Sequence, residues 1–184
     1  MRYYIVLVMM LEPALGQPTK GVEVRGEYKN RAGYAYHVTV PAGLVGHRMP
    51  APAPARGFMI RLGPSAENNI SVDGSYNAAE YSRAEEVAQR TVAWIRGEAN
   101  SVDEPRFHDV TLAGLPAVEL IVRYTDKKTK AIRMCRSVSA IRRIKPTDTV
   151  DVIYEIWLNT SAERFAQDGI VYEALVKSFR LDPQ

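Results

Sequence analysis

Histidine and cysteine are the residues of this chain best suited to metal binding or covalent catalysis, and both are scarce. The three histidines are His37, His47 and His108. No two of them have the i, i+2 or i, i+4 spacing of a metal site, and no H-E-x-x-H motif occurs. Cys135 is the one cysteine, which excludes an internal disulfide and a cysteine-based metal cluster. It lies inside a predicted strand, so we expect a buried thiol rather than a site for intermolecular pairing or an activated thiolate.

Motifs for nucleophilic catalysis and phosphate binding are absent. The sequence has no G-x-S-x-G elbow and neither of the glycine-rich phosphate loops, G-x-x-x-x-G-K and G-x-G-x-x-G. The oxygen-rich pair Asp73-Gly74 is explained by turn chemistry. An enzyme would need a site assembled from distant residues, for which His108, Asp109 and Glu155 are the candidates. We therefore expect no enzymatic activity, no cofactor and no bound metal.

Charged and aromatic residues alternate with apolar ones in three long segments, so they are expected on the polar side of three strands. These polar sides carry Glu119 and Arg123 in the first segment, Arg133 in the second, and Glu155 with Trp157 in the third. Cross-strand pairs between arginine and carboxylate explain them structurally. The alternative is a mixed-charge face, ending at Trp157, that binds a ligand or a protein.

A second candidate surface is basic. Arg142 and Arg143 follow one long strand, and a lysine-rich hairpin at 127–130 precedes it. Solvated strand ends explain these charges, and the alternative is a docking surface for an acidic protein, an anionic lipid or a polysaccharide. The net charge is +3 and the pI about 9.0. Because nucleic-acid binders concentrate positive charge more sharply, we expect no nucleic-acid partner.

The N-terminus has the composition of an export signal. Arg2 precedes an apolar stretch at 3–11, and small residues follow at 14–16. The stretch is shorter than the roughly 20 residues that span a bilayer. A buried first strand is the alternative, because the stretch has high β propensity. We expect a signal peptide at 1–16 and one exported domain at 17–184, located in the periplasm or outside the cell.

Strands must position most of the candidate residues. The alternation is clearest in three long runs and weaker in four short ones, bounded by glycine, proline and asparagine. The long runs are 117–124, 131–141 and 150–158, and the short ones 34–40, 58–62, 70–72 and 107–112. A segment at 49–55 has three alternating prolines, Pro50, Pro52 and Pro54. It is expected to be a surface loop, and His47 is placed with it.

Two helices are predicted from capping boxes. Ser82 and Glu85 begin the first, and Thr160 and Glu163 begin the second, each followed by an apolar stripe of helical spacing. Trp94 in the first helix is expected to be core or boundary packing. Long consecutive strands joined by tight turns predict antiparallel pairing. The order of elements therefore predicts an α+β domain with one antiparallel sheet of about six to seven strands.

This layout resembles the PsbP-like superfamily. The matching features are an aromatic strand ending in a proline turn, a Gly-Leu-Pro-Ala corner before a long strand, and a closing strand–helix–strand unit. They occupy 36–41, 114–117 and 154–181. The superfamily includes the extrinsic photosystem II protein, a Ran-binding nuclear import factor and exported bacterial proteins. The resemblance implies an α/β/α sandwich whose members bind or stabilise other proteins without catalysis.

Together these observations predict an exported, non-catalytic binding or accessory protein whose partner is another protein. The residues expected to contact it are Arg123, Arg133, Glu155, Trp157, Arg142 and Arg143. Two alternatives remain: an inhibitor or immunity protein that neutralises a toxin, or an enzyme with the dispersed site. Contact with a membrane surface is open, as is the oligomeric state.

Overall fold

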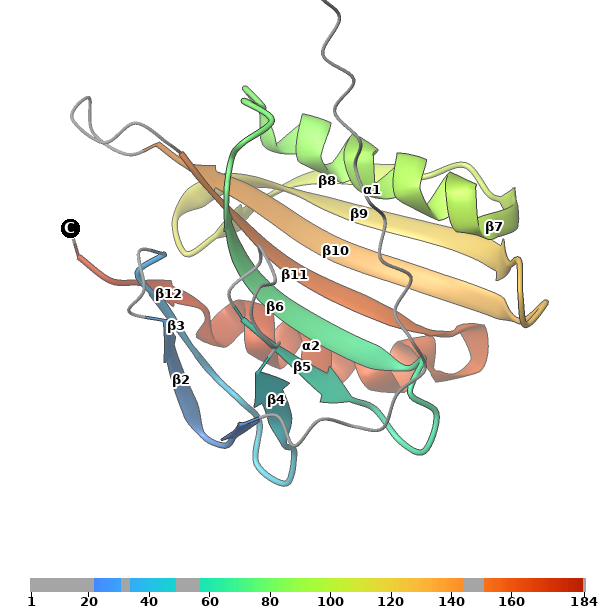
Figure 1. Cartoon of the computed structure of the whole chain (residues 1–184), viewed down its shortest axis with the longest axis horizontal. Helices are drawn as coiled ribbons and strands as arrows, with labels where there is room; N and C mark the ends of the chain where they lie inside the picture. Colours follow the sequence, from blue (N-terminus) through green and yellow to red (C-terminus); the bar gives the residue numbers. More distant parts are fainter. Residues whose placement is uncertain (1–21, 31–33, 49–56, 144–150, 184) are drawn as a thin grey trace, which may run out of the picture.

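Antiparallel strands make up most of the computed structural model, which describes residues 22–30, 34–48, 57–143 and 151–183 (Figure 1). The predicted signal peptide and the proline-rich segment 49–55 lie outside these residues. Within the described part, neither helix is long and apolar enough to cross a bilayer.

The large sheet has nine strands in the order β1-β4-β5-β6-β11-β10-β9-β7, and β8 also pairs with β9. The strands are β1 Glu23–Val24, β4 Gly46–Arg48, β5 Phe58–Arg61, β6 Asn69–Tyr76, β7 Ala99–Val102, β8 Arg106–Leu112, β9 Leu115–Asp126, β10 Ile132–Arg142 and β11 Val152–Ser161. The sheet is therefore larger than predicted. Six of the seven predicted strands belong to it, whereas the predicted strand 34–40 lies in a second sheet. The other three strands, β1, β4 and β7, have two, three and four residues and are too short to show an alternating pattern.

Two of these strands correct local predictions. His47 pairs with Met59 inside β4 instead of lying in a loop. Asp73 and Gly74 lie inside β6, paired with β11, so the turn prediction for them was wrong. Apolar and polar residues alternate through most of the segment 70–76, which indicates a longer strand. This signal was overlooked because Gly74 was taken as a strand end.

A second sheet has three strands in the order β12-β3-β2. They are β2 Glu27–Asn30, β3 Tyr36–Thr39 and β12 Arg180–Leu181. The predicted early aromatic strand is β3, and the predicted closing strand is β12, which pairs with it at His37 and Tyr36. Residues from the two ends of the described chain thus meet in one sheet.

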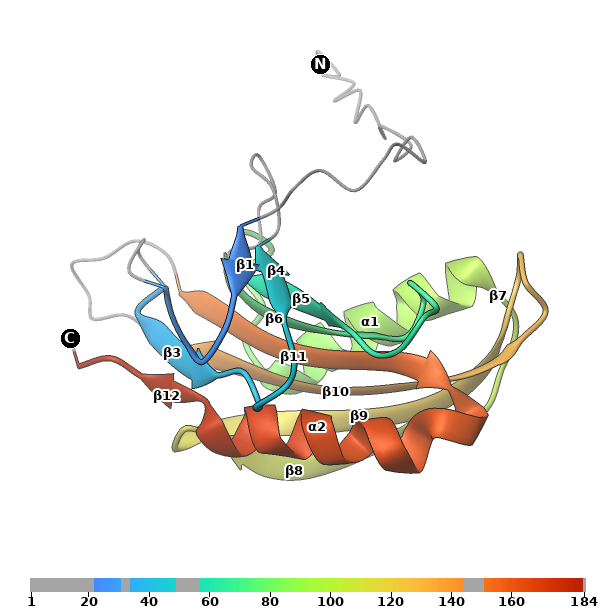
Figure 2. The same ribbon diagram turned by 90° about the horizontal axis from the view of Figure 1, so that it is seen from below.

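The two helices lie on opposite faces of the large sheet (Figure 2). Helix α1, Ala84–Glu98, packs on β9 and β10. Helix α2, Phe165–Ser178, packs on β11 after a single turn of 3₁₀ helix at Ala162–Arg164. Each helix therefore covers a different part of the sheet as well as a different face. The arrangement is an α/β/α sandwich, as the resemblance implied.

Two hydrophobic cores follow from this offset. The larger lies between α2, the small sheet and the large sheet, where Tyr36 stacks on Phe179 at 5.0 Å between ring centroids. The smaller lies under α1 and contains Leu120, Val122 and the buried Cys135. Burial of Cys135 confirms the expectation of an inert thiol, and it raises the pKa of that thiol well above its usual range.

The Gly-Leu-Pro-Ala corner is confirmed as the hairpin between β8 and β9. Leu112 pairs with Leu115, which leaves a two-residue loop of Ala113 and Gly114. Both loop residues have positive φ, 49° and 83°. This conformation suits the right-handed twist of the flanking strands and favours glycine.

Both predicted capping boxes differ in detail. At α1 the carboxylate of Glu86, one residue after the predicted Glu85, accepts hydrogen bonds from the Ser82 N–H and hydroxyl at 2.7 and 2.9 Å. The helix therefore begins one residue later than its capping box predicted. At the second helix the Thr160 hydroxyl makes no cap and donates to the buried carboxylate of Asp168 at 2.5 Å. Thr160 is the last buried residue of β11, and the helix starts only after a further turn.

Asp168 gives the first testable prediction. Its side chain is 2% exposed, and the guanidinium of Arg164 pairs with it at 2.8 Å. Changing Arg164 to methionine leaves a buried carboxylate without its cation, which should lower the free energy of unfolding by about 3 kcal/mol. Urea denaturation measures this change. Arg123→Met is the matched control, because its ion pair with Asp103 is half exposed and should contribute less than about 1 kcal/mol. Equal losses for the two variants would contradict the assignment.

Candidate functional site

The candidate site lies where α1 meets the polar side of β11. Glu155 and Trp157 are two residues apart on that strand, about 6.8 Å along its axis. Arg90 and Trp94 are four residues apart on α1, about 6 Å along the helix. The two spacings match, so each helix side chain meets one strand side chain. Arg90 donates to the Glu155 carboxylate at 2.5 Å, and Trp94 packs edge-on against Trp157 at 5.2 Å between centroids.

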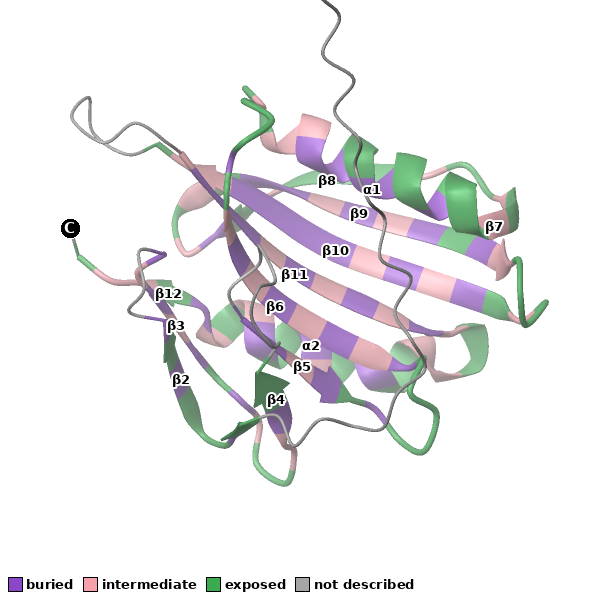
Figure 3. Ribbon diagram, in the orientation of Figure 1, coloured by how far each residue is buried: buried purple, intermediate pink, exposed green. Residues whose placement is uncertain are grey.

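This surface is aromatic and accessible. Trp94 is 53% exposed although its ring is held by Trp157. The guanidinium of Arg90 also lies 5.9 Å from the ring centroid of Tyr81. We call Tyr81, Arg90, Trp94 and Trp157 the α1 aromatic patch. Figure 3 shows the exposed outer side of α1 and the half-buried residues along β11 and β6. Of the two alternatives predicted for Trp94, core or boundary packing, the structure shows boundary packing, because its side of the helix lies at the edge of the contact with the sheet.

A pair of carboxyl groups lies next to the patch. Asp73 on β6 is directly opposite Glu155 on β11, and both point toward the α1 side. Burial and the nearby charge of Glu155 raise the pKa of Asp73 to about 7, while a hydrogen bond from Ser71 opposes the shift. The Glu155 carboxylate also accepts a hydrogen bond from Ser139 at 3.3 Å. At neutral pH this pair therefore takes up a proton more readily than two ordinary carboxyl groups.

The Asp73 carboxyl is partly shielded from solvent. The residue is half-buried, and its Oδ1 atom is buried with no hydrogen-bond partner in the described part of the chain, as are Ser137 Oγ and Trp157 Nε1. Acid–base catalysis needs a group within hydrogen-bond reach of the substrate. The buried Oδ1 atom can hold a proton inside the fold, but it cannot contact a substrate.

The predicted dispersed site is not assembled. Asp109 pairs with Val118, Val118 with Ser139, and Ser139 with Glu155. Asp109 and Glu155 are therefore three strands apart, about 14 Å between their Cα atoms. His108 neighbours Asp109 in β8 and points to the opposite face. Catalysis through these three residues acting together is excluded by this separation.

The polar sides of the three long strands do not form one face, so that prediction was wrong. Glu119 pairs with Val138, which places Glu119, Ile121 and Arg123 on the α2 side of the sheet. Glu155 pairs with Ser139, on the α1 side. The reason is the offset of the helices: β9 turns its apolar side to α1, whereas β11 turns its apolar side to α2.

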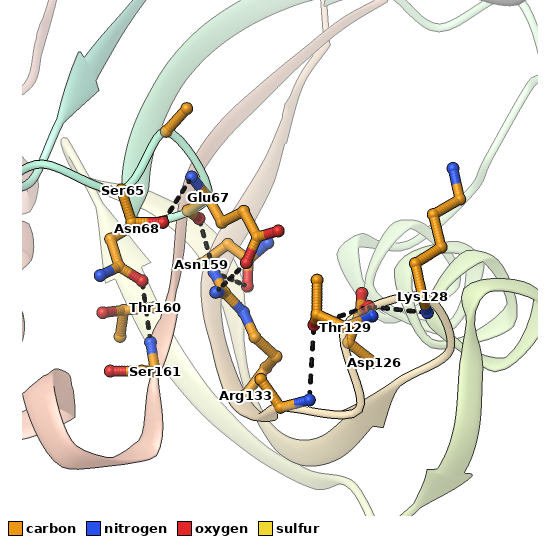
Figure 4. Close-up of polar contacts among 12 residues, drawn as sticks. Ser65, Glu67, Asn68, Asp126, Lys128, Thr129, Arg133, Asn159, Thr160 and Ser161 are labelled. Carbon is orange, nitrogen blue, oxygen red and sulfur yellow. Dashed lines mark hydrogen bonds and ion pairs between the residues drawn. The ribbon is translucent and has the colours of Figure 1, made fainter.

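Arg133 is a structural residue at the far end of the sheet. It is 4% exposed, and its guanidinium bonds to the carboxylate of Glu67 at 3.0 Å and to the Glu67 carbonyl at 2.5 Å. Figure 4 shows these contacts with Asn159, beside the hairpin that Asp126 closes through hydrogen bonds to Thr129. The arrangement ties the loop between β5 and β6 to β10 and β11. Arg133 therefore has no free donor face for a partner.

The remaining predicted residues also lie apart from the patch. Arg123 forms a half-exposed ion pair with Asp103 on the α2 side. Arg142 donates to the carbonyl of Asp182, and Arg143 binds the carboxylate of Asp151 and the carbonyl of Ser82. Of the six residues predicted to contact a partner, the structure brings together Glu155 and Trp157. Sequence reasoning missed Arg90 and Asp73, because their contacts with Glu155 depend on the position of α1 on the sheet and on the pairing of β6 with β11.

Metal-ligating side chains are dispersed. Among residues 22–30, 34–48, 57–143 and 151–183, no group of three or more His, Cys, Asp and Glu side chains is placed to hold an ion. His37 is instead paired with Asp182 at 2.8 Å. The described residues thus offer no preformed metal centre.

The fold has known counterparts, although the sequence matches no family model and no curated protein. The cyanobacterial PsbP protein (CyanoP) of Synechocystis superimposes with a TM-score of 0.53 at 15% identity, over 94% of this chain and 98% of that chain. LpqN of Mycobacterium tuberculosis, involved in cell envelope biogenesis, gives 0.48 at 9% identity over 92% and 88% of the two chains. The protein of unknown function PA94 of Pseudomonas aeruginosa gives 0.48 at 12% identity over 82% and 98%. The chain therefore has the PsbP-like fold that the order of its strands, proline turn and closing helix predicted.

Proposed function

We propose that this chain is an exported, non-catalytic binding or accessory protein that docks another protein on the α1 aromatic patch. The observation that carries the proposal is the exposed ring of Trp94, fixed against Trp157 beside the equally fixed Arg90. Tryptophan, tyrosine and arginine dominate the energetics of protein interfaces. Side chains that are already held in place lose little conformational freedom when a partner binds.

Two further points favour protein docking on the α1 aromatic patch over catalysis and over docking on the basic surface at the end of β10. His108, Asp109 and Glu155 do not converge on one point, as the strand register requires. Arg143 is already bound to protein oxygens at the end of β10. Export rests on the composition of residues 1–16, and it places the partner in the same compartment. An inhibitor or immunity role is a special case in which that partner is a toxin.

Site-specific photo-crosslinking tests the proposal in the native host. A photoreactive residue at position 93 would lie one turn from Arg90, because Ala93 is exposed on α1. We expect one discrete protein adduct from this position. The matched control is position 170, because Ile170 is 70% exposed on α2, on the other face of the sheet. No adduct from position 93, or the same adducts from both positions, would contradict the proposed docking surface.

A further inference from the structure

A cleft of about 780 Å³ lies between the start of α1 and the adjoining parts of β8, β9 and β10. Its size is in the range of pockets that hold small molecules. The floor is apolar and comes mainly from Leu115, Pro116, Val118 and Ile141. Charged side chains of both signs line the same cleft, and they belong to α1 and to the strands. The cleft is thus separate from the α1 aromatic patch, although both adjoin the same helix.

Asp109 lies at one end of the cleft, and Arg83 and Arg143 lie at the other end, together with Glu85, which also lines the cleft. Asp109 on β8 is exposed and makes no ion pair with any residue that the structure describes. Asp109 pairs with Val118 on β9, and Val118 pairs with Ser139 on β10. Arg143 follows Ser139 by four residues, so it lies about 14 Å farther along the strand direction.

Arg83 lies at the same end of the cleft as Arg143. It precedes α1 and is next to Ser82, whose carbonyl accepts a hydrogen bond from Arg143. The Arg83 side chain is 68% exposed, and its nearest carboxylates, Glu85 and Glu86, are 3.4 and 3.8 Å away. Its donors are therefore accessible to a ligand. Arg143 lies beside it, and its guanidinium is already bound to Asp151 and to the Ser82 carbonyl.

An apolar floor about 14 Å long between the Asp109 carboxylate and the end where Arg83 lies suits an extended chain with opposite charges at its ends. Four residues of extended polypeptide span roughly 13–14 Å. We propose that the cleft binds a short apolar peptide by its two free ends, with the ammonium group at Asp109 and the carboxylate at Arg83. Its side chains pack on the floor formed by β9 and β10.

Calorimetric titration with the peptide Val-Ala-Leu-Ala tests the proposal on the full chain. We expect the peptide with both ends free to bind at least about tenfold more tightly than its N-acetylated or C-amidated form, since each cap removes one charge-assisted contact. The doubly capped peptide represents an internal segment of a protein, and it should bind most weakly. Equal binding of the four peptides, or no binding of the free peptide at millimolar concentration, would overturn the proposal.

Two exposed variants separate the two ends. Asp109→Asn should weaken binding of the free peptide about tenfold and leave the N-acetylated form unchanged. Arg83→Gln should weaken the free and acetylated forms and leave the C-amidated form unchanged. Arg123→Gln, on the opposite face of the sheet, is the matched control and should bind all four like the wild type. Two results would contradict the assignment of the ends. Arg123→Gln could lose the preference for the free peptide over its capped forms, or both cleft variants could keep that preference. Crosslinking from position 93 should persist in both cleft variants, so the two proposals fail independently.

Discussion

Replacing Gly57 with alanine should lower the free energy of unfolding by about 4 kcal/mol or more, which is enough to prevent folding of many domains. Gly57 immediately precedes β5 and is buried against β6. A Cβ atom at this position would lie 1.7 Å from the carbonyl oxygen of Val72 and 2.9 Å from Oδ1 of Asp73. Backbone atoms cannot yield as a flexible side chain can, so β5 would have to separate from β6.

Urea denaturation or, for an insoluble product, the soluble fraction on expression measures the effect. Gly97→Ala is the matched control, because no atom lies within 4 Å of the added Cβ and the position is exposed in the last turn of α1. There alanine should not destabilise the chain and should add at most about 0.5 kcal/mol, since glycine is the poorer helix former. A loss below about 1 kcal/mol for Gly57→Ala would show that β5 does not approach β6 this closely.

The second large effect is a dependence of stability on pH that originates at Asp73. Its pKa is raised from 3.8 to about 7 in the folded chain. Between these two values the folded chain holds a proton that the unfolded chain releases. The free energy of unfolding should therefore fall as the pH rises from 4 to 7 and then level off. The expected contribution is on the order of 4 kcal/mol, since each pKa unit corresponds to about 1.4 kcal/mol.

Asp73→Asn should remove this dependence, because an amide does not titrate. At pH 4 the variant and the wild type should have similar stability, and at pH 8 the variant should be the more stable. Urea denaturation at the two pH values measures the difference. Asp103→Asn is the control, because its side chain is 55% exposed in a surface ion pair, and it should keep the wild-type profile. If the free energy of unfolding of Asp73→Asn fell between pH 4 and pH 8 by as much as that of the wild type, the burial of Asp73 beside Glu155 would be contradicted.

The long elements could be predicted because their patterns are local. Alternation over 117–124 and 131–141 matches β9 and β10, and the turn between them is closed by Asp126 through hydrogen bonds to the Lys128 and Thr129 N–H groups. Helical spacing after Ser82 likewise predicted α1. In each case the residues that define the element also form its contacts, so sequence order alone contains the signal.

The relation between the elements could not be predicted in the same way. Alternation divides a strand into two sides, but it does not say which side joins the polar side of its neighbour. The chain turns the apolar sides of β9 and β11 to opposite faces, because each is covered by a different helix. Arg123 and Glu155 were therefore assigned to one surface although they lie on opposite faces. Only the pairing register contains this information.

The candidate site was predicted in part for the same reason. Glu155 and Trp157 were identified because they alternate in the clearest strand. Their partners Arg90 and Trp94 come from a helix more than 60 residues earlier. A contact between a helix and a strand depends on the position of the helix on the sheet. No local pattern of either segment specifies that position.

The binding affinity of the protein crosslinked from position 93, measured by calorimetry with purified components, tests the central proposal most directly. Trp94→Ala should weaken binding by about 2 kcal/mol, a factor of roughly 30, because it removes the exposed anchor of the α1 aromatic patch. Ile170→Ala truncates an apolar side chain that is even more exposed, on the other face, and should bind like the wild type. Unchanged affinity for Trp94→Ala, or equal losses for the two variants, would contradict a docking surface on α1.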